Sequence, residues 1–247
     1  MTATIPAQVD PPMHFDPALT EARLVRRYKR FLADVRTDDG CAFTAHCPNT
    51  GSMLGCMTPG ARVWLSHSSD PKRKYAYTWQ LVEADGTMVG INTGLANRLV
   101  EEAIASGVIS ELSDWPSLRR EVRYGARHSR IDLLLEAGDR RCYVEVKNVT
   151  AAVDGGVAIF PDAVSVRGTR HLEELMVMRR EGHEAALVFC VQRGDVERVR
   201  PADRIDPVYG ERLREAADAG VRVLAYRADV DPAGVRLAKP LNVDLSP

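Results

Sequence analysis

The sequence predicts a mixed α/β fold, α+β overall, in which a small β-barrel precedes a mixed sheet flanked by helices. Three observations lead to this prediction. Short apolar stretches separated by turn residues fill the chain up to about residue 92. Helical and strand-like segments alternate after that point. The 247 residues, 45% hydrophobic and 27% charged, are typical of a soluble globular chain with one large or two small domains.

The first part of the chain is predicted to be a leader followed by a barrel. Residues 1–16 are rich in proline and are expected to form a flexible, poorly ordered leader or an extended arm. Residues 17–92 carry five short strand-like segments, which favour a small barrel of which the OB type is one option. These segments are 24–35, 43–45, 62–66, 74–83 and 88–91. The pair Asp85-Gly86 is a typical hairpin turn between the last two segments.

The second part, residues 93–247, is predicted to be a sheet domain. Its first helix carries apolar side chains on one face from Leu95 to Ile104, and Gly107 ends it. Three strands are expected next, followed by helix, strand, helix and strand, an order that predicts a mixed sheet between helices. The strands are expected at 121–124, 129–136, 141–149, 185–191 and 221–226, and the helices at 167–180 and 207–219.

Bulk properties argue against a membrane protein and against a generally basic one. The formal net charge is −1, so any nucleic-acid surface has to be local. The apolar runs are far too short to cross a bilayer, and the start of the chain has no secretory signal. Five cysteines, an odd number, favour reduced thiols and a cytoplasmic location. No membrane partner is expected.

Four residues around the second predicted segment resemble zinc ligands superficially. They are Cys41, His46, Cys47 and Cys56. Their spacing lacks the paired CxxC or HxxxH of zinc sites, so that small, semi-buried side chains are the favoured interpretation. The polar loop 46–52 has two open interpretations. It contacts phosphate through backbone N–H groups, or it is an ordered turn with an Asn49 hydrogen bond.

Three charged residues of the second part are predicted to converge. Glu145 and Lys147 share one face of a strand, because side chains alternate along it. Asp132 lies on the preceding strand. The sequence Ala137-Gly138-Asp139 forms a tight turn that pairs the two strands antiparallel. This pairing brings Asp132 towards Glu145 and Lys147.

This combination of side chains suits phosphodiester hydrolysis. Asp132 and Glu145 suit Mg²⁺, which takes one or two carboxylates and keeps several waters. Lys147 is suited to orient or deprotonate the attacking water, or to offset charge in the transition state. The alternative is a solvated sheet face with an ordinary Glu-Lys pair, worth less than about 1 kcal/mol.

Two basic clusters in the first part are the predicted DNA contacts. They comprise Arg23, Arg26, Arg27, Lys29 and Arg30 in one segment and Lys72, Arg73 and Lys74 in another. Contact with phosphate makes affinity fall steeply with salt. Tyr75, Tyr77 and Trp79 alternate after the second cluster and form either a stacking face for single strands or part of the barrel core.

The sequence resembles the sugar fermentation stimulation protein A family from about Arg23 to Tyr226. The matching stretches are RLVRRYKRFLADV, HCPNTGSM, NTGLANRLVEEAI, EVRYG, SRIDLLLE, YVEVKNVT, FPDAV with RGTRHLEEL, and IDPVYG. Together these motifs are highly specific. The resemblance implies a bacterial or archaeal DNA-binding protein linked to the regulation of sugar (maltose) metabolism.

The resemblance also implies an OB-like DNA-binding domain followed by a domain like the PD-(D/E)xK nucleases. The motif acid of that superfamily corresponds to Asp132, and its Glu-x-Lys corresponds to Glu145 and Lys147. Ile131 stands where the superfamily name has proline, but this position varies and does not touch metal. The residues before His14 are not part of the shared pattern.

Two further site positions follow from the resemblance. The first helix of the superfamily often supplies another acid, for which Glu102 or Glu101 is the candidate. A polar residue on the helix after the third strand often faces the site. Arg167 and His171, one helical turn apart, are the candidates for this role.

The leading prediction is a cytoplasmic DNA-binding protein that hydrolyses DNA with Mg²⁺ or Mn²⁺. Asp132 and Glu145 are the predicted metal ligands, Lys147 activates water and Glu102 assists. The alternative is a non-catalytic DNA-binding regulator of sugar-utilisation genes on a nuclease scaffold. The intact Asp, Glu and Lys favour the enzyme, because a pure DNA binder has no need of carboxylates that repel phosphate.

Overall fold

A computed structural model describes residues 13–125 and 129–247. The predicted leader therefore lies outside the described residues, except for its last four. Those four run beside strand β15 (Gly234–Pro240). Phe15 N donates to Ala233 O (2.8 Å), and Val235 N donates to Met13 O (3.0 Å). Residues 13–16 are thus hydrogen-bonded to a distant part of the chain, and the flexibility of the leader stays a prediction.

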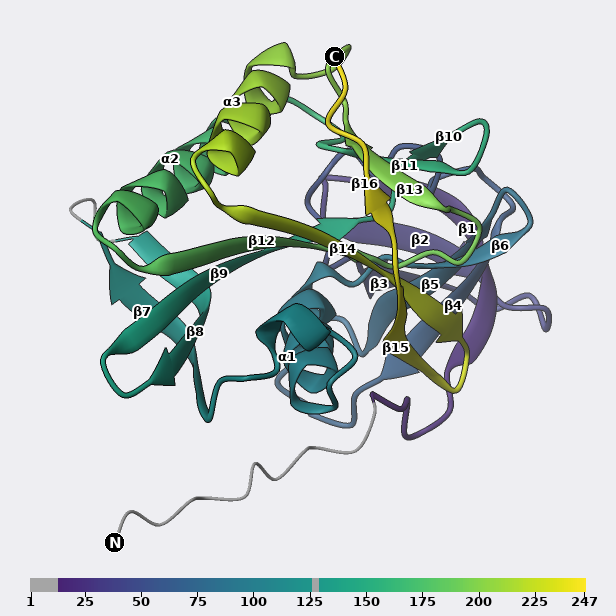
Figure 1. Cartoon of the computed structure of the whole chain (residues 1–247). Helices are drawn as coiled ribbons and strands as arrows, with labels where there is room; N and C mark the ends of the chain where they lie inside the picture. Colours follow the sequence, from purple (N-terminus) through teal and green to yellow (C-terminus); the bar gives the residue numbers. More distant parts are fainter. Residues whose placement is uncertain (1–12, 126–128) are drawn as a thin grey trace, which may run out of the picture.

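The first part of the chain folds into a closed five-stranded barrel with one additional strand (Figure 1). The sheet order is β3-β2-β1-β4-β5-β6, and a pairing of β3 with β5 closes the ring. The strands are β1 (Thr20–Tyr28), β2 (Leu32–Arg36), β3 (Ala42–His46), β4 (Arg62–His67), β5 (Tyr77–Ala84) and β6 (Thr87–Gly90). The predicted small barrel is confirmed.

The barrel differs from the prediction at two places. The predicted segment 24–35 is two strands, because the chain reverses where Lys29 and Arg30 adopt left-handed backbone conformations (φ 49° and 66°). The last predicted strand, 88–91, corresponds to β6, which extends the sheet beyond β5 and is not part of the closed ring. The five strands of the ring are therefore β1 to β5.

Alternating side chains of the strands fill the barrel interior. Leu65 of β4 and Trp79 of β5 are fully buried there. Cys47 and Cys56 are buried in the same core, in agreement with their interpretation as small packing side chains. Cys41 is exposed.

The second part is built on a six-stranded mixed sheet in the order β15-β14-β12-β9-β8-β7. Its strands besides β15 are β7 (Ser117–Tyr124), β8 (Ser129–Ala137), β9 (Arg140–Val149), β12 (Glu184–Val191) and β14 (Arg222–Asp231). Helix α1 (Ala96–Ala105) covers one face, while α2 (Val166–Arg180) and α3 (Pro207–Asp218) lie together on the other (Figure 1). The predicted helix-flanked mixed sheet is confirmed.

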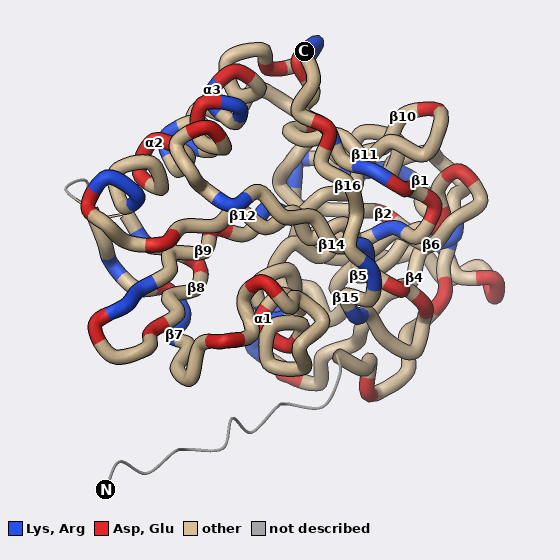
Figure 2. The backbone as a smooth tube through the Cα atoms, viewed as in Figure 1, with Lys and Arg blue, Asp and Glu red and all other residues tan. Residues whose placement is uncertain are grey.

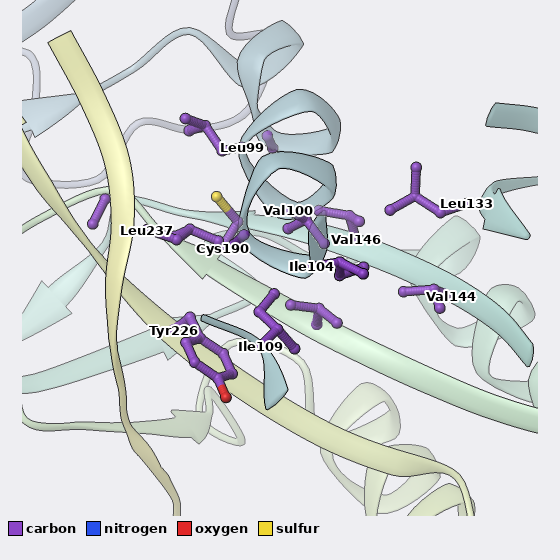
Figure 3. Close-up of a cluster of buried hydrophobic side chains, with 14 of the residues drawn as sticks. Leu99, Val100, Ile104, Ile109, Leu133, Val144, Val146, Cys190, Tyr226 and Leu237 are labelled. Atoms are coloured by element: carbon purple, nitrogen blue, oxygen red, sulfur yellow. The ribbon is translucent and has the colours of Figure 1, made fainter. Parts of the chain in front are cut away.

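Each face of this sheet has its own hydrophobic core. Helix α1 packs Leu99, Val100 and Ile104 against β9 residues Val144 and Val146 (Figure 3). Burying a side chain of this kind contributes about 1.5–3 kcal/mol. Strands β9 and β12 are covered on both faces, which explains their long apolar runs. Within the described residues, no helix has the length and apolar character needed to cross a membrane.

The sequence analysis missed one small sheet and one edge strand. The small sheet has the order β10-β11-β13-β16. Its strands are β10 (Ala152–Val153), β11 (Val157–Phe160), β13 (Arg198–Pro201) and β16 (Asn242–Val243). Strands of two to four residues are too short to show a period of two. The missed edge strand is β15, which pairs antiparallel with β14.

Direct contacts join the barrel to the sheet domain. Just beyond β12, Gln192 O accepts a hydrogen bond from Gly90 N of β6 (2.8 Å). The neighbouring Arg193 is 2% exposed and pairs with Asp195 (2.6 Å). Arg193 also reaches Asp85 in the turn between β5 and β6 (3.4 Å). These contacts hold the barrel against the carboxyl end of β12.

Candidate active site

The predicted pairing of the two strands that carry the charged residues is present. Strands β8 and β9 run antiparallel, with Leu133 opposite Val144. The turn between them contains Gly138 at φ 61°, a conformation that suits glycine. Asp132 directly precedes Leu133, the paired residue of β8 that lies farthest from this turn. Its Oδ2 accepts a hydrogen bond from Val146 N (2.8 Å), so a side chain bonds to β9 where the backbone ladder ends.

Pairing on the other side of β8 is also interrupted at Asp132. The flanking residues of β7 and β8 stay in register, so Glu121 of β7 is the residue that faces Asp132. Glu121 adopts a left-handed backbone conformation (φ 53°), which costs a non-glycine residue about 1–3 kcal/mol. Asp132 is therefore released from regular strand pairing on both sides.

Glu145 and Lys147 lie on the face of β9 that is turned towards α2. Lys147 Nζ donates to Glu145 Oε1 over 2.7 Å. The Glu145 side chain is 3% exposed and the Lys147 side chain 12% exposed, so this pair is far from the solvated pair of the alternative interpretation. A buried ion pair is stable only when further groups satisfy its remaining atoms.

Helix α2 supplies one such group, His171, and Arg167 lies one turn before it on the same helix. His171 Nδ1 is hydrogen-bonded to Glu145 Oε1 and lies 3.3 Å from Lys147 Nζ. Arg167 Nε donates to His171 Nε2 (3.2 Å). A guanidinium only donates, so Nε2 accepts and the proton sits on Nδ1, which then donates to Glu145. Both candidates from α2 thus reach the site.

The two carboxylates have pKa values displaced in opposite directions. Burial raises the pKa of Asp132, and the nearby charge of Glu145 raises it further. Burial also acts to raise the pKa of Glu145, but the charge of Lys147 and the hydrogen bond from His171 outweigh it and hold that pKa below its ordinary value. Glu145 is therefore the stably ionised acid, and a cation would favour ionisation of Asp132.

One buried carboxylate oxygen of the site lacks a hydrogen-bond partner among the described residues. Glu145 Oε2 is buried and has no hydrogen-bond partner among the described residues. Burying a charged oxygen without a partner is costly, so this atom fits a cation that it could ligate. No group of three or more His, Cys, Asp and Glu in the described ranges stands ready to hold a metal ion. Mg²⁺ and Mn²⁺ bind to one or two carboxylates with water as the other ligands, so Asp132 and Glu145 suffice.

The structure places Glu102 away from this site. Its carboxylate accepts hydrogen bonds from Arg98 Nε (2.6 Å) and from Met13 N (3.1 Å). Asn97, about 140° around α1 from Glu102, is the helix residue at the site. The prediction that Glu102 assists there does not agree with this geometry. Glu101, the other candidate, lies one turn from Asn97 and bonds to Arg120 of β7.

Asn97 is a site residue that the sequence analysis missed. Its Nδ2 donates to Asp132 Oδ1 (2.9 Å), so both oxygens of Asp132 accept a hydrogen bond. The search for acids on this helix overlooked the amide. Asn97 precedes Glu101 by four residues and so lies on the same side of α1.

Closure of the barrel brings parts of the two basic clusters to one end. His46 of β3 pairs with Leu32 of β2 on one side and with Thr78 of β5 on the other. Arg73 donates to Thr78 Oγ1 (3.3 Å). The β1–β2 turn and the β4–β5 loop therefore share this end, which we call the barrel rim. The exposed cations of the barrel rim are Lys29, Arg30, Lys72, Arg73 and Lys74.

Like Arg73 and Arg30, the other three predicted DNA contacts donate to groups of the barrel itself. Arg26 forms an ion pair with Asp34 (2.8 Å), and Arg23 donates to a backbone carbonyl (3.4 Å). Arg27 holds the loop after β3 through the carbonyl of Asn49 (2.9 Å). Figure 2 shows Lys and Arg interspersed with Asp and Glu over both parts of the chain, in keeping with the net charge of −1. DNA contact by these three arginines stays a prediction.

The aromatic residues of β5 are mainly part of the core. Trp79 is fully buried and donates its indole N–H to a backbone carbonyl (2.8 Å), so for this residue the core alternative is correct. Tyr77 packs on Phe43 at 4.5 Å between ring centroids, and Tyr75 precedes the strand beside Lys74. Phe31, in the β1–β2 turn, is 46% exposed. It directly follows the basic residues Lys29 and Arg30, and the sequence analysis did not consider it.

Comparison with known families covers both parts of the chain. The model described as "Sugar fermentation stimulation protein RE domain" matches residues 94–234, and the model "SfsA N-terminal OB domain" matches residues 25–91. This chain belongs to the sugar fermentation stimulation protein family. The resemblance that the sequence motifs indicated is confirmed, and so is the OB type of the barrel.

Members of the sugar fermentation stimulation family match almost end to end. A homolog of Thioalkalivibrio sulfidiphilus is 77% identical over 234 residues, 95% of this chain and 99% of the relative. A homolog of Geobacter sulfurreducens is 59% identical over 225 residues, 91% and 96% of the two chains. The solved structure of Pyrococcus furiosus SfsA in complex with Ca²⁺ is 30% identical. Its TM-score is 0.84, and the match covers 94% of this chain and 98% of that one.

Proposed function

We propose that this protein binds DNA and hydrolyses its phosphodiester bonds with Mg²⁺ or Mn²⁺. The observation that carries the proposal is the buried Glu145 Oε2 beside Asp132 and Lys147, which has no hydrogen-bond partner in residues 13–125 and 129–247. The Ca²⁺ of the Pyrococcus furiosus structure supports a divalent-ion site in this family. Ca²⁺ and Mg²⁺ are both hard cations that take carboxylate oxygens.

The side chains of the site have different roles in the proposed hydrolysis. Asp132 and Glu145 would hold the ion, which when bound would polarise a phosphoryl oxygen and acidify a water molecule. Lys147 orients the attacking water or offsets charge that develops on the phosphoryl oxygens. His171 and Arg167 act as positioning residues, since the imidazole bonds to Glu145 and is itself fixed by the guanidinium.

The barrel supplies affinity for the substrate in this proposal. The cations of the barrel rim are exposed and gathered at one end, although the net charge of the chain is −1. They would contact phosphate oxygens without reading sequence. Binding should then weaken steeply with added salt, because each phosphate contact releases counterions. Affinity that does not change between low and high salt contradicts this role of the barrel rim.

The decisive assay is cleavage of single- and double-stranded DNA by purified protein with Mg²⁺ or Mn²⁺. Lys147→Ala should lower the cleavage rate by at least about 100-fold, the typical contribution of a group that assists proton transfer. Binding of DNA should persist. Lys239→Ala is the matched control, because Lys239 is an exposed lysine of the edge strand β15.

Two results would overturn the catalytic proposal. One is an equal background rate for wild type and Lys147→Ala at every metal concentration. The other is cleavage that persists undiminished in EDTA. Retained DNA binding together with either result would instead support the non-catalytic regulator of sugar-utilisation genes.

A further inference from the structure

A small pocket lies between the barrel and the sheet domain, just beyond the proposed active site. It encloses about 170 Å³. Its walls come from the loop after β3, the residues before α1, the end of β9, and β11 with the residues that follow it. Val149 in its wall lies two residues beyond Lys147 on the same face of β9, a separation of about 7 Å. A ligand bound at Lys147 has to extend by about 7 Å along β9 to reach this pocket.

The lining selects a neutral ligand. Amides and hydroxyls contribute the polar wall, including Asn49, Asn148 and Thr150, and Val149 and Phe160 contribute an apolar wall. No Lys, Arg or His in the described chain lines the pocket, whereas one carboxylate does. A phosphate group would be repelled there, because nothing in the lining neutralises it. A flat, uncharged ring with hydrogen-bonding edges fits both walls.

The side-chain amides of the polar wall are oriented so that their NH₂ groups can donate to a ligand. Asn49 Oδ1 accepts from Gly51 N (2.8 Å), and Asn148 Oδ1 accepts from Gln192 Nε2. In the described residues neither amide makes a second side-chain hydrogen bond, so the NH₂ groups remain for a ligand. Carbonyl and ring-nitrogen acceptors on the edge of a nucleobase match such donors.

The barrel side of the pocket is held rigidly to the sheet domain. Ser52 Oγ donates to Asp162 O (2.8 Å), and Met53 N donates to Asp162 Oδ2 (2.9 Å). A Cβ on Gly51 would lie 3.0 Å from Asn49 Oδ1 and 3.3 Å from Asp162 Oδ2. Glycine at this position therefore allows the loop after β3 to approach Asp162 closely. The pocket is thus formed before any ligand arrives.

We propose that this pocket takes one unpaired nucleobase of the DNA, adjacent to the phosphate at Lys147. This inference rests on the proposed function and names its substrate as single-stranded or locally unpaired DNA. The volume equals that of about six water molecules, enough for one ring system and too small for a base pair. A base inside a duplex has to leave the stack to reach such a pocket.

The test uses labelled single-stranded 12-mers, each with one abasic site at a different position, and measures affinity by fluorescence anisotropy in EDTA. Thr50→Trp fills the pocket from an exposed position, and Asn148→Ala removes a donor. Thr58→Trp is the matched control, because Thr58 is exposed and lies outside the lining. Wild type should lose about tenfold in affinity when one particular position is abasic.

Thr50→Trp should bind the intact 12-mer about tenfold more weakly and lose nothing further from that abasic site. Asn148→Ala should show a smaller abasic loss than wild type, and Thr58→Trp should match wild type. An abasic loss of the same size in wild type and in Thr50→Trp overturns the proposal. So does the absence of any position-dependent loss in a wild type that binds DNA, a result that leaves the proposed function standing.

A wild type that does not bind DNA overturns the proposed function and this inference together. A second arm offers free nucleosides and free monosaccharides in saturation-transfer NMR, since a sugar is also neutral and rich in hydrogen-bonding groups. Saturation transfer to nucleosides that is lost in Thr50→Trp supports the nucleobase. Transfer to the monosaccharide alone, lost in the same variant, assigns the pocket to a sugar and contradicts the proposal.

Discussion

The carboxylate of Asp132 accepts a hydrogen bond from the backbone N–H of Val146 over 2.8 Å, at the point where β8 and β9 stop pairing. Val146 lies between Glu145 and Lys147 in the chain. The bond therefore fixes the position of one acid relative to the other two groups of the site. The irregular end of a ladder is what brings the three charged side chains together.

Asp132→Asn should stabilise the metal-free protein at pH 8. Burial and the charge of Glu145 raise the pKa of Asp132, so the folded protein disfavours the ionised form. The cost is fully present above the folded pKa and disappears as pH falls towards the unfolded pKa. Thermal unfolding in EDTA should show a gain of about 2–4 °C at pH 8, the shift that about 1 kcal/mol produces in a chain of this size.

That gain should shrink as the pH is lowered, since Asp132 itself becomes neutral. Asp38→Asn is the matched control, because it removes one negative charge in the same way at an exposed position of the β2–β3 turn. A lower melting temperature for Asp132→Asn than for wild type at pH 8 would show that the folded protein does not disfavour the ionised form of Asp132.

Asn97→Ala should weaken the binding of Mn²⁺. The amide of Asn97 donates a hydrogen bond to Asp132 Oδ1 and so orients this carboxylate. Loss of such a supporting hydrogen bond typically lowers metal affinity by about 10-fold to 100-fold. Calorimetric titration with Mn²⁺ measures the effect. Asn242→Ala, an exposed asparagine of β16, is expected to behave as wild type. Unchanged affinity in Asn97→Ala would remove this residue from the site.

Arg193→Ala should lower the free energy of unfolding by about 3 kcal/mol. Arg193 is 2% exposed and donates to Thr150 O (2.9 Å) as well as to Asp195, so its loss leaves the carbonyl of the buried Thr150 without this donor and breaks the ion pair. Urea unfolding is the measurement. Arg236→Ala breaks an exposed pair with Asp229 and should cost less than about 1 kcal/mol. Equal losses in the two variants would contradict the role of Arg193 in joining the barrel to the sheet domain.

Local patterns were sufficient to predict that Asp132, Glu145 and Lys147 converge. The alternation of β9 placed Glu145 and Lys147 on one face, and the turn at Gly138 predicted the pairing with β8. Asn97 could not be found in this way. Its contact with Asp132 depends on how α1 docks against the edge of the sheet, and the apolar stripe of a helix does not reveal which polar side chain meets an acid.

Features set by long-range contacts or by weak turn signals were missed in the rest of the fold. Lys29 and Arg30 reverse the chain without the glycine or asparagine that marks a left-handed turn, so two strands were predicted as one. The position of β6 outside the closed ring depends on the pairing of β3 with β5, which no local pattern encodes. The barrel rim follows from the same closure, through His46.

The central claim, that Asp132 and Glu145 hold a divalent ion, is tested most directly by counting bound Mn²⁺ in solution by electron paramagnetic resonance. Wild type and Lys147→Ala should each bind the ion, and Glu145→Gln should lose at least about 100-fold in affinity. Glu184→Gln is the matched control, since Glu184 lies on the same sheet and pairs with Arg140 and Arg222. Binding by Glu145→Gln that equals wild type would contradict the account.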